Sequence, residues 1–397
     1  MMDITGFGRR SALALAGAAA VSRVGPARAQ GLKLGIGTAL TQEGGALVLR
    51  MQEQKLLEAA GQEVGLPGLE GEYLGFTVLL RMLQGLAANQ LQLGMIGSTP
   101  LIRALSGPTA LVPIALAGGG NLFSVQVPKG SPVKTLEDLR GKTVLTIVAS
   151  DIHLMFARML QAQFGTENPK DVGITLRGIN ALTELSRAQS GIDAVVNMEP
   201  ISEAAERTGD LVTLVRNDGT TGDAYDGPEG KGAGHTVACF AKTPFAPEAF
   251  YPHRVWWVVR QDLLAANPKA VQAFLMAEAR ATEALATMPL RQVVETYCRE
   301  FPGEVEDRIK HMDHVLWRRR GWGWITEGDV NTLAGLSQTK SLFPTPLDPA
   351  AVRKTVALGS GVCRAAWEAT GAKPSRAAFD DKQPNDLRGK PSWEITA

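Results

Sequence analysis

A short run of small and hydroxyl-bearing residues, Gly97-Ser98-Thr99, has the composition of a ligand-binding turn. The apolar segment 91–96 predicts a buried strand before the turn, and the apolar spacing of 101–105 predicts a helix after it. A strand that ends at a helix N-terminus presents hydroxyls and backbone N–H groups, which suit a small anionic or polar ligand. The alternative interpretation is an ordinary Ser/Thr helix cap. Both can hold at once, because a capping residue points at the same cleft.

Two further polar segments stand at predicted strand ends. Ser150, Asp151 and His153 lie in a polar loop before a helical pattern, where N–H groups and a hydroxyl suit carboxylate, sulfonate or nitrate oxygens. Asp151 disfavours an anion there, because like charges repel in a closed cleft, and it suits an ammonium group or another hydrogen-bond donor. Glu199 follows the predicted strand 192–196 and is either a partner for a cationic or amide ligand or half of an ion pair across the cleft. His153 is otherwise a half-buried or surface helix residue.

A later predicted strand, residues 255–259, carries two adjacent tryptophans. Alternation along a strand places Trp256 and Trp257 on opposite faces, so that one packs in the core and the other is a candidate for lining the cleft. Arg254 is the one cation placed to meet an anionic ligand. The core interpretation competes for both tryptophans.

No residue pattern indicates catalysis. His311 and His314 make half of a metal site at best, and we interpret them as part of a packed surface helix. The chain has neither a Gly-x-Ser-x-Gly motif nor a phosphate-binding Gly-x-x-x-x-Gly-Lys-Ser/Thr motif, and its three cysteines match no metal spacing. We therefore predict a protein that is not an enzyme and has no cofactor or metal.

The first 29 residues read as an export signal. Arg9-Arg10 precede an alanine-rich apolar run, 12–21, and Ala27-Arg28-Ala29 fits the small-x-small cleavage rule. The twin arginines favour the Tat route. Sec export stays open, because Ser11 and the residues after it depart from the usual Tat pattern. We expect a mature, periplasmic protein that begins at Gln30 or Gly31; a mobile tail or membrane anchor is the alternative.

Composition limits the partners and the number of domains. The 397 residues imply about two domains. The whole chain has a formal net charge of +1, and removal of the signal, with four arginines and one aspartate, leaves −2. A nearly neutral chain argues against nucleic acid as a partner. The three cysteines allow at most one disulfide, and we expect three separate buried thiols.

Strand and helix patterns alternate over most of the chain, which indicates parallel sheets and an α/β fold. Residues 217–235 are rich in glycine and aspartate and predict a loop at or near the cleft. The predicted strands are 32–37, 91–96, 111–116, 123–127, 143–148, 173–176, 192–196, 237–241 and 255–259. The predicted helices are 47–60, 77–86, 101–105, 135–142, 152–164, 182–190, 268–287 and 349–369.

The segment 87–200 carries a family resemblance. Its phrases Leu-Gly-Met-Ile-Gly-Ser-Thr-Pro, Leu-Val-Pro-Ile-Ala and Val-Pro-Lys-Gly-Ser-Pro-Val-Lys-Thr-Leu-Glu-Asp-Leu-Arg-Gly-Lys-Thr-Val look like those of periplasmic substrate-binding proteins of ABC importers, of the nitrate/taurine/sulfonate type. The resemblance is weaker over 31–87 and 237–288 and absent beyond about residue 299.

The resemblance implies a two-lobed periplasmic binding protein fold of type II, with two crossover strands and a ligand cleft between the lobes. Residues 31–124 would begin lobe 1, 125–243 would form lobe 2, and 244–397 would complete lobe 1 and add a helical extension. In this family the loop after the first strand faces the ligand, so Thr38 and Gln42 join the candidate site. Relatives often have an aromatic residue where this chain has Met198.

The implied function is capture of a small organic molecule by hinge closure and its delivery to an ABC permease, by a monomer. One alternative is an enzyme like the thiamine-pyrimidine synthases, whose cysteine-rich motif is missing here. Another is a protein that presents its ligand to a sensor, which the long C-terminal extension motivates. A neutral, zwitterionic or amide-bearing solute fits Asp151 and Glu199 better than nitrate does, and an organic anion held by backbone N–H groups stays open.

Overall fold

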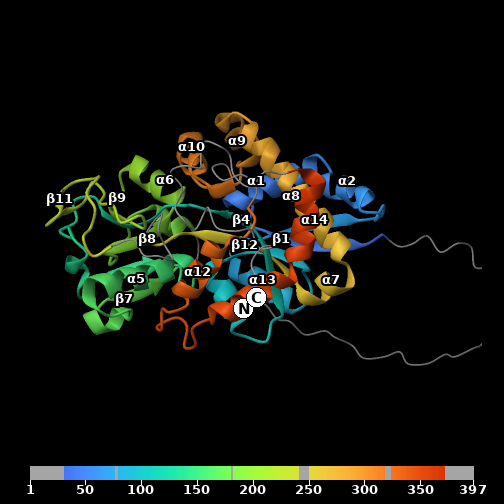
Figure 1. The fold of residues 1–397 in the computed structure, drawn as a ribbon. Coiled ribbons are helices and arrows are strands. Elements are labelled where there is room, and N and C mark those ends of the chain that lie inside the picture. Colours follow the sequence, from blue (N-terminus) through green and yellow to red (C-terminus); the bar gives the residue numbers. More distant parts are fainter. Residues whose placement is uncertain (1–30, 77–78, 180–181, 241–249, 318–322, 372–397) are drawn as a thin grey trace, which may run out of the picture. The chain divides into compact units, whose positions relative to one another are not determined.

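The computed structural model describes residues 31–76, 79–179, 182–240, 250–317 and 323–371. Within these ranges the chain forms two five-stranded sheets with helices packed against them (Figure 1). The predicted export signal lies outside the described residues. In the described part of the chain, no helix combines the length and the apolar character needed to cross a membrane.

The first sheet has the strand order β2-β1-β3-β12-β4. β1 pairs in parallel with β2 and β3, whereas β12 runs antiparallel to β3 and β4. β3, a central strand, is buried along its whole length, and so is the edge strand β4, against which α13 and α14 pack. The bounds are β1 Lys33–Thr38, β2 Glu70–Gly75, β3 Leu93–Gly97, β4 Leu111–Gly119 and β12 Arg254–Arg260.

The second sheet repeats this pattern with the order β7-β6-β8-β5-β9. β6 pairs in parallel with β7 and β8, and β5 runs antiparallel to β8 and β9. In each sheet the antiparallel strand is the first strand after the chain has crossed from the other sheet. The predicted two-lobed α/β fold with two crossings is confirmed. The bounds are β5 Phe123–Pro128, β6 Thr143–Thr146, β7 Thr175–Gly178, β8 Ala194–Met198 and β9 Leu211–Arg216.

Helices follow most of the parallel strands and continue after β12. Up to β12 they are α1 Glu43–Glu53, α2 Leu56–Glu63, α3 Leu79–Ala87, α4 Ser98–Leu105, α5 Asp151–Phe164 and α6 Ile201–Thr208. After β12 they are α7 Gln261–Ala266, α8 Pro268–Thr287, α9 Leu290–Tyr297, α10 Val305–Asp313, α12 Glu327–Leu336, α13 Pro349–Leu358 and α14 Ser360–Thr370. Short 3₁₀ turns cover Glu137–Leu139, Pro169–Val172 and Leu182–Ser186, and a small hairpin joins β10 Asp226–Gly227 to β11 Gly230–Lys231.

Side chains of strand β12 make contacts on both of its faces. Trp257 packs edge-on against Phe274 of α8, with 4.9 Å between ring centroids. On the opposite face, the indole N–H of Trp256 donates to Ser98 Oγ at 3.1 Å. Both tryptophans are fully buried, so the strand positions the N-terminus of α4 as well as the core under α8.

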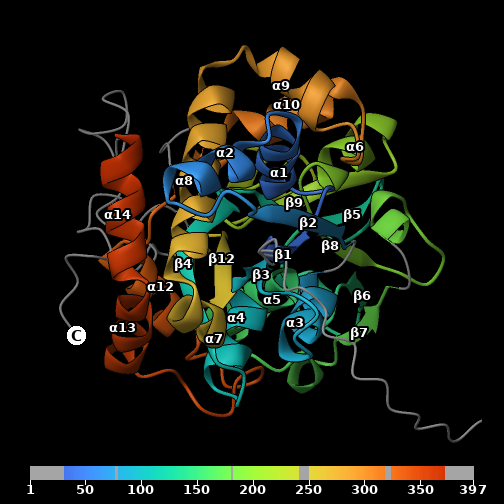
Figure 2. The same cartoon turned by 90° about the vertical axis from the view of Figure 1, so that its right-hand side faces the viewer.

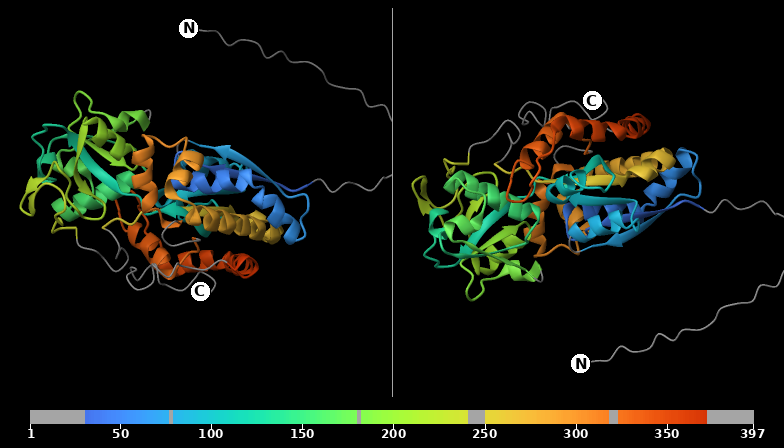
Figure 3. Two further views of the ribbon diagram at one scale, coloured as in Figure 1. Left: turned by 90° about the horizontal axis from the view of Figure 1, so that it is seen from above. Right: turned by 90° about the horizontal axis from the view of Figure 1, so that it is seen from below.

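The C-terminal extension packs on the first sheet. α13 lies against β4, and α14 lies beside α8 (Figure 2). Both views of Figure 3 show the orange and red residues lying along the blue and yellow elements of that sheet. The thiol of Cys363 in α14 donates to Ile114 O at 3.0 Å. All three cysteines are free, and Cys298 and Cys363 are buried.

Two predicted helices are interrupted. The helix predicted over 47–60 is divided into α1 and α2 by Lys55, whose backbone adopts a left-handed conformation with φ 49°. The helix predicted over 349–369 is divided at Gly359 into α13 and α14. The helix predicted over 182–190 is only a 3₁₀ turn, and the Gln189 side chain donates to Glu184 O just beyond it.

The strand predicted over 237–241 is wrong for the described residues 237–240. Val237 N donates to Gly219 O and Phe240 N donates to Val237 O, which makes a turn. Phe240 stacks on Phe250 with ring centroids 4.5 Å apart. Its apolar character therefore reflects packing between loops and not a sheet position.

Two strands and one hairpin were not predicted. β2 has exposed and half-exposed residues throughout, so its sequence lacks the apolar alternation of a strand. β9 is a short apolar run next to the glycine-rich segment 217–235, which itself contains the β10–β11 hairpin. The lobe boundaries at 124/125 and 243/244 stay predictions: β5 begins at Phe123, and residues 241–249 lie outside the described part.

Packing of α8 on β12 makes the first testable prediction. Phe274→Ala removes a fully buried ring from the contact with Trp257 and should lower the free energy of unfolding by about 3–5 kcal/mol. Leu358→Ala, at a position that is 50% exposed, is the matched control and should change it by less than about 0.5 kcal/mol. Urea denaturation measures both. Equal stability of the two variants would contradict the packing.

Candidate ligand-binding pocket

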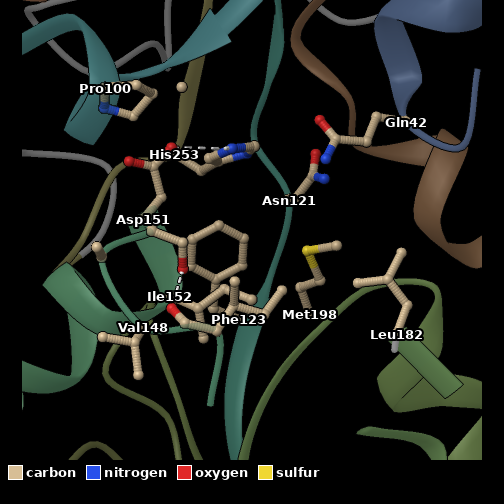
Figure 4. A pocket seen from close by; sticks show the side chains of 14 residues that line it. Gln42, Pro100, Asn121, Phe123, Val148, Asp151, Ile152, Leu182, Met198 and His253 are labelled. Carbon is tan, nitrogen blue, oxygen red and sulfur yellow. Dashed lines mark hydrogen bonds and ion pairs between the residues drawn. The ribbon is translucent and has the colours of Figure 1, made fainter. Parts of the chain in front are cut away.

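A pocket lies between the two sheets, and both contribute to its wall (Figure 4). From the first sheet come residues at the start of α1, the end of β3 and α4; from the second come the loop before α5 and the end of β8. The space measures about 730 Å³, which includes solvent at the open mouth.

Most of the pocket wall is apolar. Phe123, Ile152, Leu182 and Met198 lie around the space together with the backbone and side chains of 147–149 (Figure 4). Among the residues that the structure describes, no lysine or arginine lines this pocket. The polar lining residues are Gln42, Asn121, Ser150, Asp151 and His253. The pocket thus suits a compact molecule with an apolar body and few hydrogen-bonding groups.

The carboxylate of Asp151 connects the two sides of the pocket. Ser98 N donates to Asp151 Oδ2 at 3.1 Å, and Thr99 N donates to Asp151 Oδ1 at 2.6 Å. These N–H groups belong to the first turn of α4, where backbone donors have no partner within the helix. Asp151 is also the first residue of α5. The positive ends of two helix dipoles therefore face one carboxylate.

Gly97 leaves the space that this carboxylate fills. A Cβ at residue 97 would lie 2.1 Å from Asp151 Oδ2. The backbone of Gly97 has φ −72°, which any residue adopts. The glycine is thus required by close approach and not by conformation. Burial raises the pKa of Asp151, and the hydrogen bonds from Thr99 and Ser98 oppose that shift.

His253 stands between two buried carboxyl groups. Its Nδ1 is 3.9 Å from Glu43 Oε1, its Nε2 is 3.9 Å from Asp151 Oδ2, and its ring lies 4.7 Å from that of Phe123. Burial, followed by the positive charge of Arg254, lowers the pKa of His253 to about 3. The imidazole is therefore neutral at neutral pH.

Several buried polar atoms next to the pocket have no hydrogen-bond partner. Asn121 Nδ2 donates to Glu43 Oε2 at 3.1 Å, which leaves Asn121 Oδ1 and Glu43 Oε1 unpartnered. His253 Nδ1 is unpartnered too. A buried polar atom without a partner is destabilising by roughly 1–3 kcal/mol. Such atoms beside a cavity are what a bound molecule would satisfy.

The predicted site residues are only partly brought together. Gln42, Gly97, Ser150 and Asp151 line the pocket. The Ser150 hydroxyl does not point its hydrogen at a ligand, because it donates to Ile147 O at 2.6 Å. Ser98, Thr99, His153, Glu199, Arg254, Trp256 and Thr38 are not part of the lining.

His153 shapes the loop behind the pocket. Its Nδ1 accepts a hydrogen bond from Ala149 N at 3.1 Å, and burial lowers its pKa. Ala149, which lines the pocket, has φ 66°, a left-handed conformation that is unusual for a residue with a side chain. The histidine therefore supports a strained backbone and does not face the space.

Glu199 is engaged outside the pocket. Its Oε2 accepts from Leu122 N at 2.9 Å and lies 2.6 Å from His314 Nε2 and 3.7 Å from His311 Nδ1. Burial raises the pKa of Glu199, but the two histidines outweigh it and hold the pKa at about 2. His311 lies on the buried face of α10, and His314 follows the end of this helix, which agrees with the interpretation as a packed surface helix.

The side chain of Arg254 lies away from the pocket, at the first sheet. Its Nε donates to Asp329 Oδ1 in α12 at 3.0 Å, and both side chains are buried. Trp256 Nε1 of β12 donates a hydrogen bond to Ser98 Oγ at the start of α4, and Thr38 is buried at the end of β1. Arg254 is not among the residues that line the pocket, and its contact with an anionic ligand stays a prediction.

Asn121, Phe123 and His253 are pocket residues that sequence reasoning missed. All three stand at the two places where the chain passes between the sheets. A signal was available: both crossings were predicted, and crossing residues must lie at the interface between lobes. The polar groups expected at the site lie at strand ends, whereas these three residues precede or begin strands.

The two-lobed fold is shared with solved structures of periplasmic binding proteins. A solved structure of the periplasmic aliphatic sulphonate-binding protein SsuA from Escherichia coli is 18% identical, with a TM-score of 0.56 over 80% of this chain and 91% of that one. The periplasmic nitrate-binding protein NrtA from Synechocystis PCC 6803 is 14% identical, with a TM-score of 0.60 over 92% and 93% of the two chains. A putative sulfonate-binding SsuA from Methylobacillus flagellatus KT is 18% identical, with a TM-score of 0.58 over 87% and 98%.

Residues 79–291, more than half of the chain, match the NMT1/THI5-like family model, and the chain belongs to that family. No curated protein matches it in sequence. The resemblance inferred from residues 87–200 is confirmed at the level of family and fold.

The environment of His253 predicts a pH dependence of stability. Because folding lowers its pKa from 6.5 to about 3, the unfolded chain binds a proton between these pH values that the folded chain does not. Stability should therefore fall as the pH drops from about 6.5 towards 4.5, and His253→Gln should flatten this slope by up to about 1.4 kcal/mol per pH unit. Urea denaturation at several pH values measures it.

The matched control is His235→Gln, at a half-exposed histidine of the β10–β11 region. It should leave the slope between pH 6.5 and 4.5 as in the wild type. An unchanged slope in His253→Gln would show that His253 titrates in the folded protein as it does in the unfolded chain.

Proposed function

We propose that this protein is the solute-binding component of an ABC importer and carries a small organic molecule in the pocket between its sheets. One observation carries the proposal: a single pocket is walled by residues of both sheets, and a buried carboxylate of one sheet's helix bonds to the backbone of the other. A molecule in that space touches both lobes at once. Family membership and the binding proteins among its structural neighbours support it.

The mechanism is ligand-stabilised closure. A ligand with contacts to both lobes favours the closed arrangement by its differential affinity, and a permease then recognises that arrangement. Micromolar affinity corresponds to about 8 kcal/mol. Apolar burial against Phe123 and Met198, with a few hydrogen bonds to groups such as Asn121, is sufficient for this. We further propose that the protein is exported to the periplasm by its first 29 residues, through the Tat pathway, and acts as a monomer.

An enzyme of the thiamine-pyrimidine-synthase kind has less support. None of the three cysteines belongs to the pocket lining, and the neighbours named above are binding proteins. The sensor alternative rested on the C-terminal extension, which packs on the chain's own first sheet. Neighbouring genes for a permease and an ATPase would favour transport, and a lone sensor kinase gene would count against it.

Thermal unfolding with a solute panel tests the proposal. Sulfonates, nitrate, aromatic acids, amines and pyrimidines should include at least one compound that raises the Tm, because a ligand at 100 times its Kd adds about 2.7 kcal/mol. That corresponds to a shift of a few degrees.

Two variants place the binding in the pocket. Val148→Trp puts a large ring at a half-exposed position of the pocket wall and should abolish the shift, and Leu358→Trp, equally exposed but remote in α13, should keep it. A shift that survives Val148→Trp would place the solute elsewhere. Absence of any shift would count against solute binding.

A further inference from the structure

We propose that the Asp151 carboxylate occupies the anion-binding position at the N-terminus of α4, so that the pocket selects organic solutes with hydrogen-bond donor groups, such as an amidinium or ammonium, over oxyanions. The inference rests on the proposed solute-binding function and names the class of solute for the same pocket.

The first argument is geometric. The two carboxylate oxygens accept from two consecutive N–H groups of α4, Oδ2 from Ser98 and Oδ1 from Thr99. A nitrate, carboxylate or sulfonate would use these same donors, since backbone N–H groups at a helix N-terminus bind two oxygens of one anion in this way. While Asp151 is bonded there, a free anion finds no donor on that helix.

The second argument is the fit of the carboxylate. The absent Cβ of Gly97 leaves the space that Asp151 Oδ2 fills, since a Cβ would lie 2.1 Å from that oxygen. Asp151 is 8% exposed, so little solvent competes for the two N–H groups. The N-terminus of α4 and the space above Gly97 therefore fit one particular carboxylate, which is the side chain of Asp151.

The third argument is the polarity of what remains. The unpartnered oxygen that lines the pocket, Asn121 Oδ1, is an acceptor on a side chain that is 4% exposed, and the carboxyl group of Asp151 lines the same space. The nearby guanidinium of Arg254 is bonded to Asp329 in the first sheet. An oxyanion would meet carboxyl oxygens without a neutralising cation, whereas an N–H-bearing group would meet acceptors that lack donors.

A pair of probes with the same shape tests the solute class. Benzamidine and benzoate share a flat apolar ring and differ in carrying an amidinium or a carboxylate. Benzamidine should raise the Tm of the wild-type protein; benzoate, formate and nitrate should not, each against sodium chloride at equal ionic strength. An equal or larger shift with benzoate or nitrate would overturn the inference.

A substitution at Asp151 should reverse the preference. In Asp151→Ala the two N–H groups are free, so formate and nitrate should bind at least tenfold more tightly than in the wild type, and the benzamidine shift should disappear. Asp151→Asn preserves the shape without the charge and serves if the alanine variant does not fold. Asp223→Ala, at an exposed aspartate, is the matched control and should behave as wild type.

The outcomes separate this inference from the proposed function. Hits confined to anions in the wild type would support solute binding and overturn the inference. Another outcome is that no solute binds the wild type but formate binds Asp151→Ala. This would overturn the proposed solute-binding function and the proposed solute class. It would still support the inference that Asp151 occupies the anion-binding position of α4. No gain of anion binding in either Asp151 variant would overturn the occupancy.

Discussion

The paired hydrogen bonds from the first turn of α4 to Asp151 are the contact on which the arrangement of the pocket depends. They join the end of β3 in one sheet to the beginning of α5 in the other. Hydrogen bonds to an ionised group are shorter and stronger than neutral ones, and the dipoles of two helices add to them. Desolvation acts in the opposite direction, which is why burial raises the pKa of Asp151. The stability of this contact therefore depends on opposing contributions from hydrogen bonding and desolvation. A ligand, a proton or a hinge motion can alter either contribution.

Two other charged groups around the crossings, Arg254 and Glu199, have their partners away from the pocket. Arg254 is paired with Asp329, and Glu199 is paired with His311 and His314. Glu203, half-buried beside this group, has a pKa raised to about 9 by burial and by the Glu199 charge. At the pocket, Asn121 Oδ1 and His253 Nδ1 have no hydrogen-bond partner in the described part of the chain. The polarity of the site therefore depends on where the ion pairs around it are placed and not on the net charge of the chain.

Much of the fold could be predicted from the sequence because it rests on patterns that act locally. The periodicity of 268–287 predicted α8 at its observed bounds, and the apolar run around 123–127 predicted β5. β2 could not be found, because an edge strand with exposed residues lacks an apolar pattern. The turn over 237–240 was mistaken for a strand, because apolar side chains that pack between loops resemble those of a strand. For the site, Gly97, Ser150 and Asp151 were predicted at strand ends and Gln42 from the family resemblance, and all four line the pocket. The partners of Arg254 and Glu199 lie in the C-terminal part, where no resemblance guided the interpretation.

The Gly97-Ser98-Thr99 turn differs from its prediction in the group that it binds, and this shows how much a local motif can predict. The turn was expected to bind a ligand through its N–H groups, and those groups do bind a carboxylate, but it is that of Asp151. The local sequence determines that the donors exist and where they point. Asp151, which belongs to the other sheet, decides whether a free anion can reach these donors. A substitution at Asp151 would leave the two N–H groups available to a solute. Members of one family can therefore keep the same turn, the same helix and the same pocket and still differ in the charge of the solute, since function depends on the site and not on the fold that carries it.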